Sequence, residues 1–232
     1  ALIGGEMAEH PGVMDPNEYD LSGFTVGIVD RPAMIGPARV QDGDVLIGLA
    51  SSGLHSNGYS LARKVCTEGK TLYELTIARD ELEGDSVLDA LLEPTRIYVK
   101  SIRSVLLQCP GAIHSLAHIT GGGITENLNR ALPSTLDAEI QVGSWNMVPI
   151  LPWVCRAAHL NETEALKTFN MGLGMILAVA PQKAEEVAQL LADAGEEVYI
   201  VGQVVPGVGK VVYLDEEELF AAYSEDEEAE ED

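Results

Sequence analysis

Short apolar segments of strand length alternate along the chain with longer segments whose apolar residues recur at helical spacing. The run VLIGLA is apolar throughout, as expected for a strand covered on both faces. The pattern predicts strands over residues 45–50, 112–119, 136–142, 171–180, 197–205 and 209–214. It predicts helices over residues 59–66, 97–107, 124–132 and 183–195, a short helix ending before Pro94, and a proline-interrupted helix over residues 148–160. These elements indicate an α/β domain with one buried sheet.

A further strand-like segment, residues 20–30, precedes a stretch rich in proline and glycine, residues 31–44. Proline and glycine interrupt regular secondary structure, so this stretch is predicted to be a connector and a domain boundary.

The segment HITGGGITEN, residues 118–127, contains three consecutive glycines between a predicted strand and a predicted helix. Three glycines are entropically costly inside a regular element, so we expect a strand-to-helix turn here. Such a turn directs backbone N–H groups outward at the positive end of the helix, which suits a phosphate. The segment matches neither of the two common glycine-rich nucleotide motifs, and a purely structural tight turn is the alternative.

His55 and Asn57 follow directly after the apolar strand at residues 45–50. Polar side chains at the C-terminal end of a buried strand commonly line the binding site of an α/β protein. The structural alternatives are an ordinary helix cap at Ser56 or Asn57 and a plain loop position for His55.

Near the start of the chain, Glu6 and Glu9 lie three residues apart behind a pair of glycines, Gly4 and Gly5. Paired carboxylates on a tight turn are able to hold Mg²⁺ or to position a polar substrate. Two solvated surface glutamates are the structural alternative.

The chain has a formal net charge of −23, which is concentrated toward its C-terminus. The last 18 residues, from Asp215, hold 11 of the 37 acidic residues and no basic residue; 26 acidic and 14 basic residues remain, a net charge of −12. Nucleic acid is therefore not an expected partner, because phosphate neutralisation requires a basic surface. Residues 215–232 are predicted to be a disordered acidic tail, with an acidic interaction arm as the alternative.

No run of 18 apolar residues occurs, so we expect no membrane partner. The N-terminal residues do not have the pattern of a signal peptide. Three widely spaced cysteines without a zinc-binding pattern favour a reducing, cytoplasmic location.

Five motifs in register resemble the phosphoribosylformylglycinamidine cyclo-ligase (AIR synthetase) family. They are GGEMAEHPG, SSGLHSNGYSLARK, EPTRIYVK, AHITGGGITEN and TFNMGLGM. The resemblance covers about residues 1–214 and only the C-terminal part of the family, so most of an N-terminal domain is expected to be missing from this chain. It implies a three-layer α-β-α (α/β, α+β) domain over residues 35–214, preceded by a remnant of the N-terminal ATP-binding domain over residues 1–34.

The resemblance also implies a reaction. In this family ATP phosphorylates the formyl oxygen of formylglycinamidine ribonucleotide, an amidine nitrogen attacks the activated carbon, and phosphate leaves as the ring of 5-aminoimidazole ribonucleotide closes. ATP and Mg²⁺ are the implied cofactors, the ribonucleotide is the implied partner, and the full-length form is expected to be a homodimer. Because part of the site would lie in the missing domain, this chain alone is expected to be inactive.

The resemblance also implies which residues form the site, by their positions in the matching motifs. His55, His118 and Glu6 are the implied catalytic residues, and Glu6 is also the implied metal ligand. The implied nucleotide- and substrate-binding residues are Gly4, Gly5, Glu9, Asn57, Thr120, Gly121, Gly122, Gly123, Asn127 and Asn170. The chain departs from the family's usual residues at Met7 and His10, where threonine and methionine are usual. The alternatives are another ATP-dependent enzyme of the superfamily, of the thiamine-monophosphate kinase or selenophosphate synthetase type, and a non-catalytic nucleotide-binding fragment.

Overall fold

The computed structural model describes residues 1–15 and 17–220, and the chain divides into two compact units. The first unit is Ala1–Met34, and the second begins at Ile35. The first unit contains one short 3₁₀ helix, Arg31–Ala33, and an isolated bridge between Pro11 and Met14.

The strand predicted over residues 20–30 is not formed, and this prediction is wrong. The side chains of Phe24, Val26 and Ile28 do alternate with polar or small residues. A strand also requires a neighbour that pairs with its backbone N–H and C=O groups, however, and the described residues of the first unit offer none.

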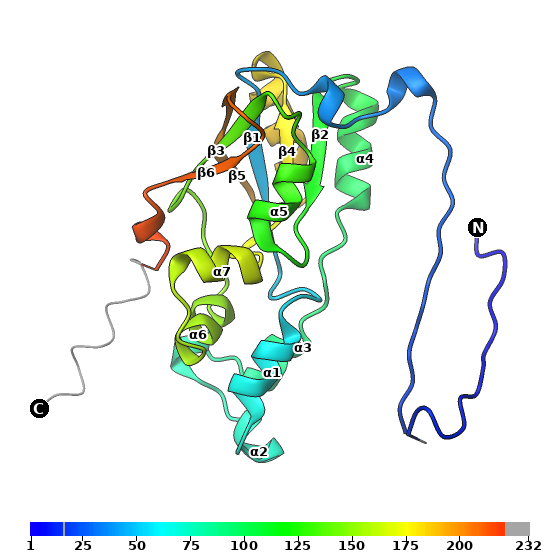
Figure 1. The fold of residues 1–232 in the computed structure, drawn as a ribbon, viewed down its shortest axis with the longest axis vertical. Coiled ribbons are helices and arrows are strands. Elements are labelled where there is room, and N and C mark those ends of the chain that lie inside the picture. Colours follow the sequence, from blue (N-terminus) through cyan, green and yellow to red (C-terminus); the bar gives the residue numbers. More distant parts are fainter. Residues whose placement is uncertain (16, 221–232) are drawn as a thin grey trace, which may run out of the picture. The chain divides into compact units, whose positions relative to one another are not determined.

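The second unit is built on one six-stranded sheet in the order β2-β4-β1-β5-β3-β6 (Figure 1). The strands are β1 (Val45–Ala50), β2 (Ile113–His118), β3 (Leu136–Gln141), β4 (Leu173–Val179), β5 (Val198–Pro206) and β6 (Val211–Leu214). All neighbouring pairs are antiparallel except β3 and β6, which are parallel. The six strands predicted from residue 45 onward are confirmed, with ends that differ by a few residues.

Helices pack on both faces of this sheet. The helices of the second unit are α1 (Tyr59–Thr67), α2 (Leu72–Leu75), α3 (Val87–Leu92), α4 (Val99–Gln108), α5 (Gly123–Arg130), α6 (Ile150–Ala157), α7 (Glu162–Thr168) and α8 (Ala184–Asp193). On one face, Ile47 and Leu177 of the sheet pack with Val105 of α4 and Val187 of α8. The opposite face packs against α5 in a larger apolar cluster, which also includes residues of α1, α3, α6 and α7. The predicted three-layer α/β architecture is confirmed.

Two helices were not predicted, namely α2 and α7. Each begins at a capping box. The side chain of Thr71 or Asn161 accepts a hydrogen bond from the backbone N–H of the glutamate three residues later, and the side chain of that glutamate accepts one from the backbone N–H of Thr71 or Asn161. The proline-interrupted helix is a regular helix, α6, because Pro152 lies in its first turn, where a missing N–H costs no intrahelical bond. No helix among residues 1–15 and 17–220 is long and apolar enough to cross a membrane.

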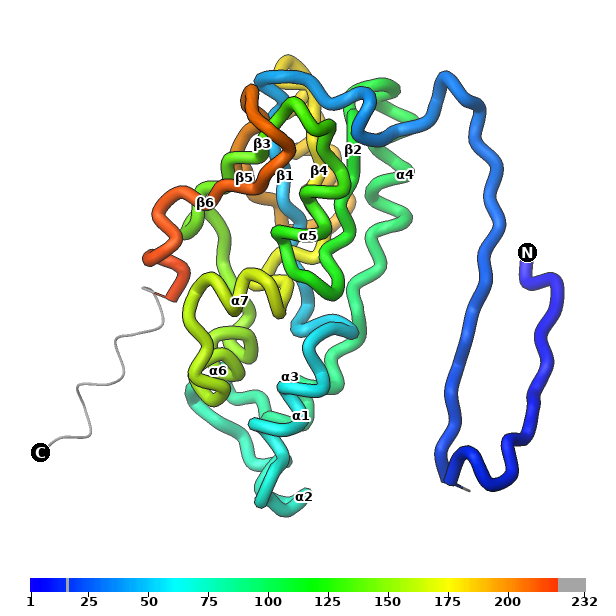
Figure 2. The backbone as a smooth tube through the Cα atoms, viewed as in Figure 1, coloured from blue at the N-terminus to red at the C-terminus, as the bar shows by residue number. Residues whose placement is uncertain are grey.

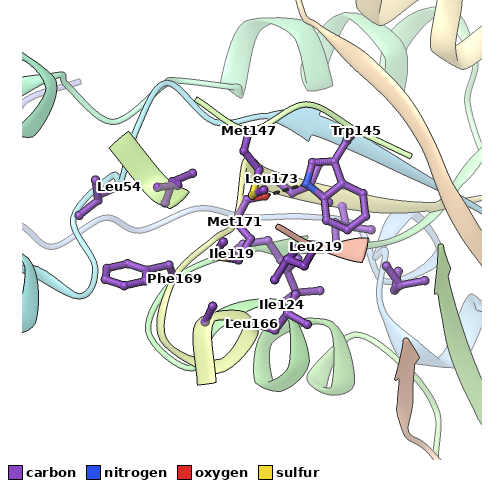
Figure 3. Packing of buried hydrophobic residues seen from close by; sticks show 14 of the residues in the cluster. Leu54, Ile119, Ile124, Trp145, Met147, Leu166, Phe169, Met171, Leu173 and Leu219 are labelled. Carbon is purple, nitrogen blue, oxygen red and sulfur yellow. Dashed lines mark hydrogen bonds between the residues drawn. The ribbon is translucent and has the colours of Figure 1, made fainter. Parts of the chain in front are cut away.

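Residues 215–220 do not belong to a disordered tail, contrary to the prediction from charge. They form a turn that includes a 3₁₀ helix, Glu216–Glu218, and Thr163 Oγ1 hydrogen-bonds to Glu216 at 2.5 Å. Leu219 is 4% exposed and lies in the apolar cluster near Ile124 (Figure 3). The rest of the predicted tail, residues 221–232, lies outside the described residues.

The buried position of Leu219 generates a test. Leu219→Ala should lower the free energy of unfolding by about 2–4 kcal/mol, because it removes buried apolar surface and leaves a cavity. The matched control is Glu217→Ala, an exposed neighbour that should change stability by less than about 0.5 kcal/mol. Urea unfolding of both variants provides the measurement, and equal stability of the two would contradict the packing of this turn.

Candidate functional site

Three strand ends meet at one edge of the sheet because β4 pairs with both β1 and β2 in antiparallel fashion. Ala50, the last residue of β1, lies opposite Leu173, the first residue of β4. His118, the last residue of β2, lies opposite Met175 near the start of β4. The loops after β1 and after β2 and the loop before β4 therefore converge, as Figure 2 shows for the chain leaving β1 and β2. Three of the five motifs are brought together by this pairing.

The glycine turn has the strand-to-helix conformation that the sequence predicts. Gly122 and Gly123 have φ angles of +91° and +61°, which favour glycine, and α5 begins at Gly123. A Cβ atom on Gly123 would lie 2.0 Å from the carbonyl oxygen of Leu166 in α7. Gly123 is therefore required by packing as well as by conformation.

Asn127 holds the turn from within α5. Its Nδ2 donates to the carbonyl oxygens of Thr120 at 3.1 Å, Gly121 at 3.2 Å and Gly123 at 2.8 Å, and its Oδ1 accepts from Thr120 Oγ1 at 3.0 Å. The carbonyl groups of the turn are thus directed inward. Among the described residues, the N–H groups of Gly121 and Gly122 have no hydrogen-bond acceptor. Backbone donors left in this way at a helix start are suited to an anion.

Asn57 is a neighbour of this turn. A Cβ atom on Gly121 would lie 3.8 Å from Asn57 Oδ1, with no closer contact, and Gly121 is exposed. The next residue, Gly58, has a φ of +72° and lies against the ring of Phe169, where a Cβ atom would overlap the ring. The loop after β1 therefore holds Asn57 beside the glycine turn.

His55 is a buried histidine in a left-handed conformation, with a φ of +55° and 3% exposure. Its Nε2 accepts the N–H of Ser52 at 3.1 Å and the N–H of Arg96 at 3.5 Å. Since Nε2 is an acceptor, the proton of the neutral ring is on Nδ1. Nδ1 is buried and has no partner among the described residues. A buried donor without a partner costs free energy, so Nδ1 is an unsatisfied group of this site.

Burial is also the main reason that His55 is neutral. It lowers the pKa of His55 from 6.5 to about 4, and the electrostatic interactions with His118 and Arg96 act in the same direction. At neutral pH His55 is therefore a hydrogen-bond donor without a charge.

Tyr98 lies between the two histidines of the site. Its Oη donates to the carbonyl oxygen of Ala50 at 2.7 Å, and its ring centre is 6.3 Å from that of His55 and 6.5 Å from that of His118. A Cβ atom on Gly174 would lie 1.9 Å from Tyr98 Oη and 2.6 Å from His55 Cε1. A glycine inside a strand commonly marks such a close approach, and Gly174 is one. The tyrosine itself was missed, because in EPTRIYVK it reads as one more apolar helix position.

The remaining predicted residues of the second unit differ in exposure. His118 is exposed at the end of β2 and lines an apolar cavity of about 460 Å³ with Tyr98, Ile102 and Leu116. Asn170 is fully buried: its Oδ1 accepts from Ser51 Oγ and from the N–H of Gly172, and its Nδ2 donates to the carbonyl oxygen of Gly53. Asn170 thus links the loop after β1 with the loop before β4.

The predicted residues Gly4, Gly5, Glu6 and Glu9 belong to the first unit, so their part in the site stays a prediction. In the part of the chain that the structure describes, no three His, Cys, Asp or Glu side chains gather closely enough to hold a metal ion.

The fold and the site together define a three-layer α/β domain with polar groups gathered at one edge of a mixed sheet. The chain belongs to the AIR synthase related protein family, whose C-terminal domain matches residues 41–215.

Curated relatives support the same family. The chain is 48% identical over 215 residues to the phosphoribosylformylglycinamidine cyclo-ligase of Brevibacillus brevis, covering 92% of this chain and 60% of that protein. It is 45% identical over 204 residues to the enzyme of the same name from Bifidobacterium longum subsp. infantis, covering 88% and 58%. The chain thus spans about 60% of the length of these relatives, and the predicted resemblance to the C-terminal part of the cyclo-ligases is confirmed.

A solved structure shares the fold. The thiamine-monophosphate kinase of Stenotrophomonas maltophilia superposes with a TM-score of 0.53 at 16% identity, covering 80% of this chain and 54% of that one. At this identity the likeness concerns the fold alone.

The buried state of His55 predicts a pH-dependent stability. The unfolded chain binds a proton at this histidine near pH 6.5 and the folded chain only near pH 4, so stability is complete above pH 6.5 and is lost as the pH falls toward 4. The contribution is up to about 3 kcal/mol, at about 1.4 kcal/mol per pH unit. Asn is the best replacement, because it tolerates a positive φ.

The measurement is urea unfolding of the wild-type protein and of His55→Asn at several pH values across this window. The wild-type protein should lose more stability than the variant as the pH falls, since carboxylates titrate equally in both. Parallel stability curves would show that His55 is not held neutral by burial.

Proposed function

We propose that the protein of which this chain forms a part catalyses the ATP-dependent cyclisation of formylglycinamidine ribonucleotide to 5-aminoimidazole ribonucleotide, ADP and phosphate in purine biosynthesis. The observation that carries the proposal is the pair of N–H groups at Gly121 and Gly122, which have no acceptor among the described residues and lie beside Asn57 at the sheet edge where the loop of His55 also lies. The 45–48% identity to cyclo-ligases gives the reaction class.

The glycine turn is proposed to hold phosphate. The N–H groups of Gly121 and Gly122 donate to phosphate oxygens at the start of α5, where the helix dipole favours negative charge. Asn57 offers a further amide beside Gly121, and the exposed His118 offers a donor at the end of β2. Fixed donors of this kind stabilise the charge that develops on a transferred phosphoryl group.

His55 is proposed to act on the oxygen that becomes phosphorylated. Its Nδ1–H is a neutral donor, able to polarise the formyl carbonyl without placing a positive charge beside the attacking amidine nitrogen. When the nitrogen attacks the activated carbon, the carbon–oxygen bond to phosphate breaks and inorganic phosphate leaves. Both reacting groups belong to one substrate, so holding them in place supplies much of the rate enhancement.

ATP and Mg²⁺ are proposed as cofactors. Mg²⁺ is usually held by one or two carboxylates together with substrate phosphates, so it needs no cage of three protein ligands. Glu6 is the proposed carboxylate ligand, with Glu9, Gly4 and Gly5 on the same segment as binding residues. When bound, the ion would neutralise charge on the phosphates.

The location and assembly are part of the proposal. The three cysteines, Cys66, Cys109 and Cys155, are all buried free thiols, which is compatible with a cytoplasmic enzyme. We propose a homodimer for the full-length form and a small-molecule substrate with no nucleic acid or membrane partner.

The other enzymes of the superfamily are less well supported. The kinase of the same fold is 16% identical to this chain, against 45–48% for the cyclo-ligases. A non-catalytic fragment remains a separate hypothesis for this chain by itself, and turnover by a completed protein discriminates the two.

Gly121→Val tests the phosphate site. Gly121 does not have a positive φ and its Cβ direction is open, so valine should fold normally and obstruct the approach of a ligand. Binding of ribose 5-phosphate and of MgATP should weaken at least tenfold, about 1.4 kcal/mol. Gly122 is a poorer choice, because its φ of +91° would strain any side chain.

The control is Asn129→Val, which places the same side chain at an exposed position of α5. Isothermal titration calorimetry compares the two variants with the wild-type protein. Equal binding by Gly121→Val and the wild-type protein would reduce the turn to a structural role.

A second experiment tests the incomplete site. This chain alone should fold but should not release ADP in the presence of formylglycinamidine ribonucleotide, because phosphoryl transfer needs metal and donors on both sides of the γ-phosphate. A chimera that adds the N-terminal part of the Brevibacillus brevis relative should restore turnover. Comparable turnover by the two proteins would place the whole catalytic site within these 232 residues.

A further inference from the structure

A buried carboxylate, that of Glu196, forms an ion pair with Arg96, whose backbone N–H contacts His55. Glu196 belongs to none of the five motifs. Glu196 follows α8, and its side chain is 7% exposed. Its Oε2 lies 3.0 Å from Arg96 Nε, and its Oε1 lies 2.5 Å from Ser101 Oγ at the start of α4. The guanidinium group of Arg96 also donates to the carbonyl oxygen of Gly195 at 2.8 Å. A buried carboxylate of this kind is stable only while its counter-ion stays in place.

The ion pair fixes the segment that forms one wall of the site. Arg96 belongs to residues 94–96, which contact the loop after β1 at three points. Ser52 Oγ donates to the carbonyl oxygen of Pro94 at 2.7 Å, the hydroxyl groups of Ser56 and Thr95 are 3.1 Å apart, and the N–H of Arg96 donates to His55 Nε2. The position of Arg96 therefore decides whether His55 has its second N–H partner.

The sheet explains why a residue so distant in sequence reaches the site. β5 pairs with β1 in antiparallel fashion, with Val198 opposite Leu49. The N–H of Ala50 donates to the carbonyl oxygen of Glu197 at 3.0 Å. The start of β5 therefore lies at the same sheet edge as the end of β1, and Glu196 lies two residues before β5 begins.

We propose that Glu196 is a positioning residue for His55. By anchoring Arg96 it keeps the backbone N–H of Arg96 on Nε2, so that the imidazole has a single tautomer with its proton on Nδ1. That proton is the donor that the site presents to a ligand oxygen, such as a carbonyl or a phosphate. The inference rests on the proposed function for the role of the donor, but the geometry of the ring is measurable without any turnover.

The charged and titratable groups that face His55 are Arg96, His118 and Tyr98. Arg96 and His118 disfavour a proton on the ring, and Tyr98 is itself occupied by the carbonyl oxygen of Ala50. None of these three side chains accepts from Nδ1. The choice between tautomers therefore depends on the two N–H groups that reach Nε2, and only the one from Arg96 depends on Glu196.

The experiment is nitrogen-15 NMR of the histidine rings in the full 232-residue chain at neutral pH, with His55 assigned by His55→Asn. The wild-type protein should show one tautomer with the proton on Nδ1. Glu196→Ala should shift the two ring nitrogens of His55 toward a mixture of tautomers. Glu196→Gln keeps the shape and an acceptor for Arg96, and should largely restore the wild-type spectrum.

Two further variants keep the test decisive. Glu197→Ala, at the exposed neighbouring carboxylate, should leave the His55 signals unchanged. Arg96→Ala should reproduce the shift of Glu196→Ala, and the double variant should be no worse than either, as expected for residues that act through one contact. If Glu196→Ala does not fold, the shift of Arg96→Ala is the deciding result.

A wild-type His55 spectrum in both Glu196→Ala and Arg96→Ala, or in Arg96→Ala alone where Glu196→Ala does not fold, would overturn the proposal. This result is distinguishable from a failure of the proposed function. If the tautomer shifts as expected but ribose 5-phosphate and MgATP do not bind the wild-type chain, the positioning stands and the ligand assignment fails. If they bind and the tautomer does not shift, only the role of Glu196 fails.

Discussion

The pairing of β4 between β1 and β2 is the constraint on which the candidate site depends. Because both pairs are antiparallel, β1 and β2 run in the same direction and end at the same edge, where β4 begins. Gly174 then permits Tyr98 and His55 to approach the backbone of β4 more closely than any side chain would allow. One strand and one glycine thus bring together three motifs that are spread over more than 100 residues of the sequence.

The polar groups of the site are divided between internal ties and free donors. The side-chain amides of Asn127 and Asn170 hydrogen-bond to the backbone of the loops around them, and buried polar groups usually have such partners. The N–H groups of Gly121 and Gly122 and the Nδ1 of His55 have no acceptor among the described residues. These three groups are the donors to which the proposed function assigns an acceptor from outside the chain.

Local pattern predicted most of the sheet and the glycine turn, because period and glycine content are properties of short segments. VLIGLA and the turn at Gly121 were found in this way. Tyr98 and Glu196 were not found in this way, because their contacts join segments that are distant in sequence and the spacing of residues within one segment does not encode them. The same limit explains two errors: residues 20–30 have the pattern of a strand but no neighbour to pair with, and Leu219 is buried although it stands in an acidic stretch.

The most direct measurement of the central claim is a titration of the nitrogen-15-labelled chain with ribose 5-phosphate, observed at the backbone amides. The account predicts saturable shifts at the N–H groups of Gly121 and Gly122 and at the ring nitrogens of His55, with little change at Gly111, a glycine at the opposite end of β2. Saturable shifts that leave these two amides unmoved, or no saturable shift at all, would contradict it.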